Sequence, residues 1–254
     1  MRVAWVHPTW RDLVIERLAA DAALRHRFLG RCGPHGVVLA LSTSGGAEGE
    51  RRLPLICDDE DWDALGDRIY TLVPELEHAE LVAIFAAIGR ALRDLIREEP
   101  ARAGEARVLA RMALQRTDSV WTAANAPVPL DCIDAWLGLS KHFDPLLMPG
   151  FLAPTWAELL PTELPDPDDL PEVQRFTDWM TLSELVGSFS VDLLGELGYG
   201  SAQGKLRRDF RDHRRWELER QGRIADWPTA TVETHESRSE RITDGVIRRV
   251  LHDL

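Results

Sequence analysis

Apolar residues recur at helical spacing along most of this chain. In the first segment Trp10, Leu13, Val14 and Leu18 follow the i, i+3, i+4, i+8 rule, which places them on one face of a helix. The longest such stripe runs through residues 77–98. Short connections join the segments, and short connections favour antiparallel neighbours. The pattern predicts an all-α fold of irregular stacked helical hairpins, arranged either as a solenoid or as a bundle.

Capping residues predict where several of these helices begin. Asp21 precedes an apolar periodic segment, as an N-cap residue does, and another such segment follows Asp58. Thr155 and Thr181 each stand three residues before a glutamate, which is the spacing of a capping box. We therefore expect helices directly after Asp21 and Asp58, a brief helix starting at Thr155, and another starting at Thr181.

Composition changes abruptly after residue 160. Residues 161–171 form a Pro- and Asp-rich segment that favours a linker over a helix. This divides the chain into a helical module at 1–160, the linker, and a C-terminal helical subdomain at 172–254.

The N-terminus begins with a short strand-like segment in which Val3 and Trp5 alternate with small neighbours. A strand of this length is not stable alone, so it has to pair or dock elsewhere. Together with Trp10 in the following helix, Val3 and Trp5 are our candidates for an interface.

Charge and hydropathy exclude several classes of protein. The chain has 254 residues, 44% of them hydrophobic, and a formal net charge of -12. A surplus of acids argues against a protein that coats nucleic acid. No apolar run approaches the roughly 20 residues that cross a bilayer. Three cysteines are an odd number at wide spacing, which fits reduced thiols. We expect a cytoplasmic protein without a membrane partner.

The motifs for binding nucleotides and metals are incomplete in this chain. In the segment 198–206 Tyr199 stands where a phosphate-binding loop has its first glycine, and Leu206 replaces the metal-binding hydroxyl. Asp59, Asp61 and Asp63 have the spacing of a calcium loop, but its turn glycine and final glutamate are missing. These acids are better explained as a first helical turn that favours negative charge. We expect no nucleotide, no cofactor and no metal.

One motif carries an enzymatic alternative. Arg208 and His213 have the spacing of the active-site motif of HEPN-type ribonucleases, which are all-helical, and the segment resembles that motif. The resemblance implies that Arg208 stabilises charge and that His213 acts as acid or base on RNA. Residues five apart on a helix point about 140° away from each other, which weakens this alternative.

A second resemblance is strongest from about Val3 to Leu76 and continues weakly through residues 128–137 and 152–161 of the helical module. The landmarks are Val-His-Pro-Thr-Trp-Arg-Asp-Leu-Val-Ile at 6–15 and Leu-Pro-Leu-Ile-Cys-Asp-Asp-Glu-Asp-Trp at 53–62. They resemble the helical region that follows the ATPase core of STAND-class signalling ATPases. The resemblance implies a helical arm that senses a trigger or couples sensing to oligomerisation, often in bacterial conflict or antiphage defence.

No ATPase core accompanies these landmarks, so ATP-driven switching is not implied for this chain. One expectation from the resemblance is that the chain is a truncated or split part of such an ATPase. The function we favour from the sequence is a non-enzymatic helical interaction or sensor module. Its expected partner is another protein or a second copy of the chain.

Overall fold

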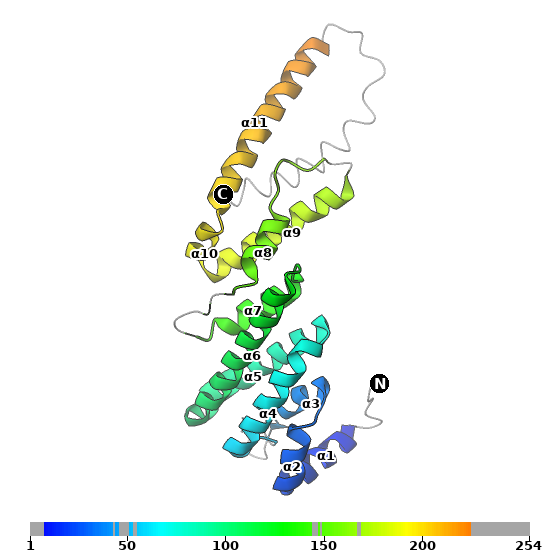
Figure 1. Cartoon of the computed structure of the whole chain (residues 1–254), viewed down its shortest axis with the longest axis vertical. Coiled ribbons are helices and arrows are strands. Elements are labelled where there is room, and N and C mark those ends of the chain that lie inside the picture. The colour runs from blue at the N-terminus through cyan, green and yellow to red at the C-terminus, as the bar shows by residue number, and fades with distance from the viewer. Residues whose placement is uncertain are drawn as a thin grey trace. The chain divides into compact units, whose positions relative to one another are not determined.

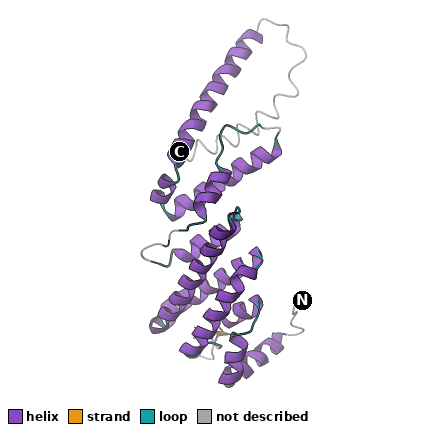
Figure 2. Cartoon of the chain, viewed as in Figure 1, coloured by secondary structure: helices purple, strands orange, loops and turns teal. Residues whose placement is uncertain are grey.

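The computed structural model describes residues 8–42, 44–45, 51–52, 55–143, 147, 149–166 and 169–224 (Figure 1). The regular elements of these ranges are helices, apart from one antiparallel pair of two-residue strands, β1 (Ser44–Gly45) and β2 (Arg51–Arg52) (Figure 2). The predicted all-α fold is therefore confirmed. In chain order the helical elements are α1 (Pro8–Ala20), α2 (Ala22–Leu29), α3 (Pro34–Ala40), α4 (Asp59–Leu72), η1 (Val73–Glu75), α5 (His78–Glu98), η2 (Pro100–Arg102), α6 (Ala103–Ala124), α7 (Leu130–Ser140), α8 (Leu152–Leu159), α9 (Leu170–Phe189), α10 (Val191–Glu196) and α11 (Tyr199–Ile224).

The chain forms two compact units, Met1–Pro154 and Thr155–Leu254. Their division falls inside α8, shortly before the segment 161–171 that the sequence predicts as a linker. Helix α9 begins at Leu170, within that segment. The linker and its two flanking domains stay a prediction.

Helix α5 is the centre of the first unit, where it packs against α3, α6 and α7 (Figure 1). Its apolar stripe faces inward, and Ile84 and Leu92 are completely buried. Burying one side chain of this size contributes roughly 1.5–3 kcal/mol. The stripe that predicts the longest helix therefore also builds the core of this unit.

Helices α4 and α6 lie side by side and run in the same direction. A Cβ atom added to Gly66 would lie 3.6 Å from Leu109 Cδ1 and 3.7 Å from Met112 Cε. One turn further along both helices, the Arg116 guanidinium carbon lies 4.4 Å from the ring centre of Tyr70. Residue numbers therefore rise together along the two helices, which fixes their register.

Helix α7 runs antiparallel to α6 and ends beside the N-terminal half of that helix. Trp136 donates a hydrogen bond from Nε1 to the Leu114 carbonyl at 3.1 Å. Just beyond the C-terminal end of α7, the Arg111 guanidinium carbon lies 5.3 Å from the ring centre of Phe143. The end of α7 therefore lies beside the third turn of α6.

The predicted capping residues have mixed outcomes. Asp21 accepts a hydrogen bond from the Leu24 amide at 3.0 Å, so this cap is confirmed. Asp58 accepts one from the Asp61 amide at 3.0 Å and is the cap of α4, the helix expected after it. The start predicted at Thr155 is wrong, because α8 begins at Leu152 and Thr155 is buried inside the helix.

The start predicted at Thr181 is also wrong, since that residue lies in the interior of α9. Its hydroxyl donates to the Thr177 carbonyl at 3.0 Å, a back-bond that threonine makes inside helices. The cap of α9 is Asp169, which accepts from the Glu172 amide at 3.1 Å. Pro171 in the first turn supports this earlier start, because backbone amides in the first turn have no acceptor within the helix and proline lacks such an amide.

Aromatic side chains hold the second unit together. Trp179 of α9 stacks on Tyr199 of α11 with ring centres 5.6 Å apart, and Trp156 of α8 lies 5.8 Å from Trp179. Lys205, the lysine of the rejected phosphate-loop segment, donates to the Thr162 carbonyl. Gly198 has a φ of 78°, a left-handed conformation that favours glycine between α10 and α11.

Candidate functional site

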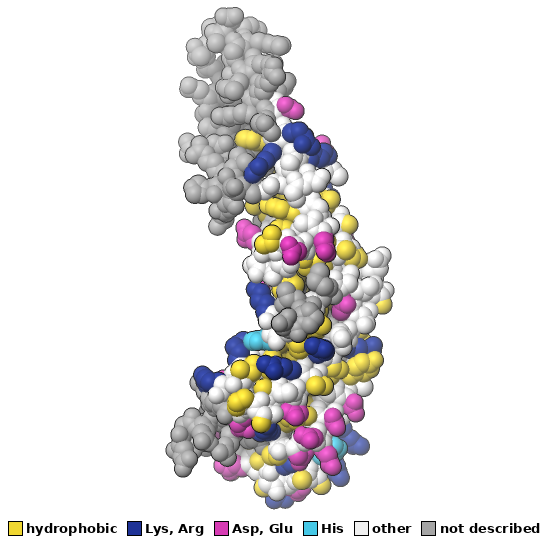
Figure 3. Space-filling view, turned by 90° about the vertical axis from the view of Figure 1, so that its left-hand side faces the viewer, with side chains coloured by type: hydrophobic (Ala, Val, Ile, Leu, Met, Phe, Trp, Pro, Cys, Tyr) yellow, Lys and Arg dark blue, Asp and Glu magenta, His cyan; other side chains and the backbone are white. Residues whose placement is uncertain are grey.

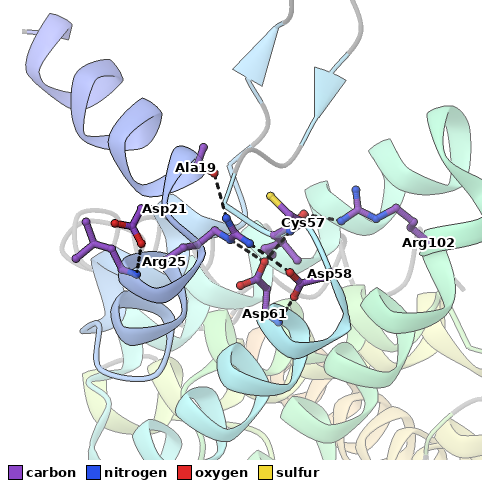
Figure 4. A network of polar contacts seen from close by, with 9 residues as sticks. Ala19, Asp21, Arg25, Cys57, Asp58, Asp61 and Arg102 are labelled. Carbon is purple, nitrogen blue, oxygen red and sulfur yellow. Dashed lines mark hydrogen bonds and ion pairs between the residues drawn. The ribbon is translucent and has the colours of Figure 1, made fainter.

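The most buried polar network of the described residues joins α2 to α4 (Figure 4). Asp61 Oδ2 accepts from Arg25 Nε at 2.8 Å and from the Cys57 amide at 2.9 Å. Arg25 also donates to Asp58 Oδ2 at 3.3 Å and to the Ala19 carbonyl at 3.1 Å. Burial by itself lowers the pKa of Arg25, but its hydrogen bond and attraction to Asp61 raise the pKa overall. The guanidinium therefore stays charged.

This network is a structural cross-link rather than a reactive site. Arg25 and Asp61 have exposed fractions of 5% and 1%, so neither is accessible to a substrate. The sequence predicts Asp61 as one of the acids of a first helical turn, and it lies there, but it is buried against another helix. Its partner is 36 residues away in the chain, and no local pattern reveals such a pairing.

A group of cations gathers where α5, α6 and α7 meet. Arg111 covers the ring of Phe143, and Lys141 and His142 directly follow α7. Arg93 of α5 and Arg107 of α6 both lie close enough to His142 to affect its ionisation. We call Arg93, Arg107, Arg111 and Lys141 the cationic cluster.

The cationic cluster has no neutralising carboxylate among the described residues, and none of its four members forms an ion pair there. Burial, followed by repulsion from Arg93 and Arg107, lowers the pKa of His142 below its usual value of 6.5. At neutral pH the histidine is therefore mostly uncharged, and the cluster carries its charge on arginine and lysine.

An exposed apolar position lies beside the cationic cluster on α6. Val108 has an exposed fraction of 71%, although the two residues that follow it, Leu109 and Ala110, are buried. The buried stripe consists instead of Leu109, Ala113 and Leu114 and their neighbours. Helix geometry explains the difference, because Val108 points about 100° away from Leu109.

Acidic side chains lie on the other side of Val108. One turn after Val108, Met112 lies on the side of α6 that faces α4, close to Gly66. Arg111 lies on the opposite side, which faces the end of α7. Because α4 and α6 run in register, Asp63 lies near the level of Val108, and Asp63 is exposed. The α6 face therefore presents cations, an apolar centre and acids in that order. We define it as the cationic cluster together with Val108, Met112, Asp59, Asp63 and Asp67.

The same three kinds of side chain are visible on the face drawn in Figure 3. There Lys and Arg side chains gather around a histidine, hydrophobic side chains lie below them, and Asp and Glu side chains lie further down. A surface that mixes both charges with exposed apolar groups suits contact with another polypeptide.

Groups that could hold a cofactor or react chemically are sparse in the described ranges. There, no three His, Cys, Asp or Glu side chains come together as a metal site would need. Burial raises the pKa of Cys32 to about 11, and burial together with Asp131 raises the pKa of Cys132 to about 12. These two thiols stay protonated and act as packing groups, whereas Cys57 is exposed.

The site residues named from the sequence lie in different parts of the chain. Arg208 lies exposed on α11. His213 belongs to the same helix, but its side chain lies outside the described part, and so does the side chain of Trp10 in α1. Val3 and Trp5 lie outside it entirely. The ribonuclease pair and the N-terminal interface therefore stay predictions.

Two general findings bear on function. Across the described ranges, no helix combines the length and apolar character that spanning a bilayer requires. Comparison with known proteins finds no matching family, no matching curated protein and no matching solved structure.

Proposed function

We propose that this chain is a non-enzymatic helical interaction module that binds a protein partner through the α6 face. The observation that carries the proposal is the exposed Val108 at the centre of this face, beside four cations without ion-pair partners among the described residues. Apolar side chains this exposed gain free energy when a partner covers them. The arginines of the cationic cluster add specificity, because each guanidinium binds a carboxylate in a planar, two-point geometry.

The order of residues on this face favours a protein over a nucleic acid. A polyanion needs a continuous run of cations, whereas this face also contains acids of α4, which packs against α6. The net charge of -12 also repels nucleic acid at long range.

The resemblance to STAND-class ATPases supports a role for such contacts in sensing. In this proposal the module is the recognition or coupling arm of a bacterial conflict system, and its contact with a partner transmits the signal. A STAND-type ATPase that binds the chain through the α6 face would support this role. An identified partner of unrelated function would argue against it.

Purification from the native cells tests the interaction function. The tagged chain is compared with Val108→Glu and with the control Val191→Glu, which changes another exposed valine, on α10. Quantitative mass spectrometry should identify the same protein in each replicate with the wild type and the control. We expect roughly tenfold less of it with Val108→Glu, equivalent to about 1.4 kcal/mol. Equal recovery with all three chains would refute the proposed surface.

A further inference from the structure

The α6 face carries cations and acids, and their arrangement makes the face complementary to a second copy of itself. On the helix surface Arg111 and Met112 lie on opposite sides of Val108, because they follow it by three and four residues. The Arg111 side borders α7, and the Met112 side borders α4 with Asp63. Cations and acids therefore flank one exposed apolar position.

We infer that a second copy of this chain binds the α6 face and forms a two-fold symmetric dimer. This inference rests on the proposed interaction function and adds a second copy of the chain as an occupant of the same face. In a two-fold interface the same patch meets itself, so a contact between residue i and residue j occurs twice. A two-fold axis that runs along α6 near Val108 places Asp63 of each copy opposite Arg111 of the other. The two Val108 side chains then meet at the centre.

The chemistry of the face suits this arrangement. Arg107, Arg111 and Lys141 have no carboxylate partner of their own among the described residues, so pairing across the interface breaks no ion pair that these cations already form there. Asp59, Asp63 and Asp67 are exposed on α4 and supply the opposite charge. Each copy thus provides carboxylates to the cations of its neighbour.

In this dimer the α6 helices of the two copies would approach each other closely over their first turns. Gly104 lies one turn before Val108, and a Cβ added there would meet no atom within 4 Å. The approach is therefore not blocked by a side chain of α6 at that position.

Charge reversal tests the dimer, because in a two-fold interface a double variant restores what each single variant breaks. Sedimentation velocity of the purified full chain is measured from about 1 μM to about 500 μM. The wild type should dimerise with rising concentration. Arg111→Asp and Asp63→Arg should each weaken the association at least about tenfold by placing like charges opposite each other. The double variant D63R/R111D should recover association close to the wild type.

Two further variants guard against loss of fold. Arg27→Asp makes the same charge change as Arg111→Asp on an exposed part of α2 and should leave the dimer intact. Val108→Glu removes no ion pair, and it should abolish the dimer with unchanged helical content. Arg111 also covers Phe143, so melting temperature is recorded for each variant.

A wild type that stays monomeric over the whole range overturns the dimer, and so does a double variant that fails to recover. Neither result touches the proposed interaction function, whose test is the Val108-dependent recovery of a different protein. If purification recovers no different protein although the chain dimerises, the proposed interaction function fails and the dimer stands.

Discussion

Replacing Asp61 with asparagine should destabilise the first unit strongly. The side chain has an exposed fraction of 1% and accepts two hydrogen bonds, from Arg25 Nε at 2.8 Å and from the Cys57 amide at 2.9 Å. Both bonds go to one oxygen, Oδ2, so an asparagine oxygen in that place still accepts them, but the side chain no longer carries a negative charge. The buried Arg25 guanidinium then lacks its main counter-charge. Breaking a buried ion pair on one side costs about 3–5 kcal/mol, and we expect about 3 kcal/mol here.

Hydrogen exchange at rising urea concentrations measures this cost locally, from the amides of α2 and α4. Asp59→Asn is the matched control, since it removes an exposed acid from the same helical turn and should cost less than about 1 kcal/mol. Replacing the whole pair, Arg25→Met with Asp61→Leu, should recover much of the loss because no buried charge remains. An Asp61→Asn variant as stable as Asp59→Asn would refute the reasoning.

Packing and ionisation of single side chains lead to three more predictions. Gly36→Ala should cost about 1–3 kcal/mol in thermal unfolding, because the added Cβ would lie 2.5 Å from Cys32 Cβ. Arg107→Gln should raise the pKa of His142 in an NMR titration, since repulsion from that arginine helps to lower it. Cys57 should react with a thiol reagent well before Cys32, because it is exposed and Cys32 is buried with a pKa raised to about 11.

Controls for these experiments exist in the same unit. Gly138→Ala adds a Cβ with no atom within 4 Å and should stabilise α7 slightly. Arg27→Gln should leave the pKa of His142 unchanged, and an equal shift in both variants would contradict the assigned cause. Cys132 should be as slow as Cys32. Rapid labelling of all three thiols would contradict the described packing.

The lowered pKa of His142 also sets the direction of a pH effect on stability. The unfolded state binds the proton more readily than the folded state, so stability falls as pH drops through the usual value of 6.5. Replacing His142 with glutamine should flatten this part of the pH profile of the melting temperature.

Sequence periodicity predicted the helices of the first unit because their buried stripes are strong and their caps are local. The stripe of α5 and the cap at Asp21 depend on residues within one or two turns, so the sequence alone reveals them. The prediction at Thr181 was wrong because a threonine three residues before a glutamate also fits the interior of a helix. Local spacing does not distinguish these cases when the preceding turns are also compatible with a helix.

The candidate surface could not be predicted in the same way. The ion pair of Arg25 with Asp61 and the exposure of Val108 depend on which helices become neighbours. Val108 belongs to a run of apolar residues, and its exposure follows from the packing of α6 against both α4 and α7. The charges on either side of Val108 come from several helices, so no single motif contains them.

The ribonuclease alternative predicts an enzymatic activity that the interaction module would lack, and a separate experiment tests it. It requires cleavage of structured RNA that is lost in His213→Ala and in Arg208→Ala with unchanged helical content. The interaction account predicts no cleavage by the wild type.

Site-specific photo-crosslinking in the native cells tests the central claim most directly. A benzophenone amino acid replaces Val108 in one variant and the exposed Val191 of α10 in another. Because the reagent links only to groups in direct contact, the account predicts one defined protein adduct from position 108 and none of that mass from position 191. The adduct should disappear when Arg107 and Lys141 are both changed to glutamine. Absence of an adduct at position 108, or the same adduct from both positions, would contradict the claim that the α6 face is a contact surface.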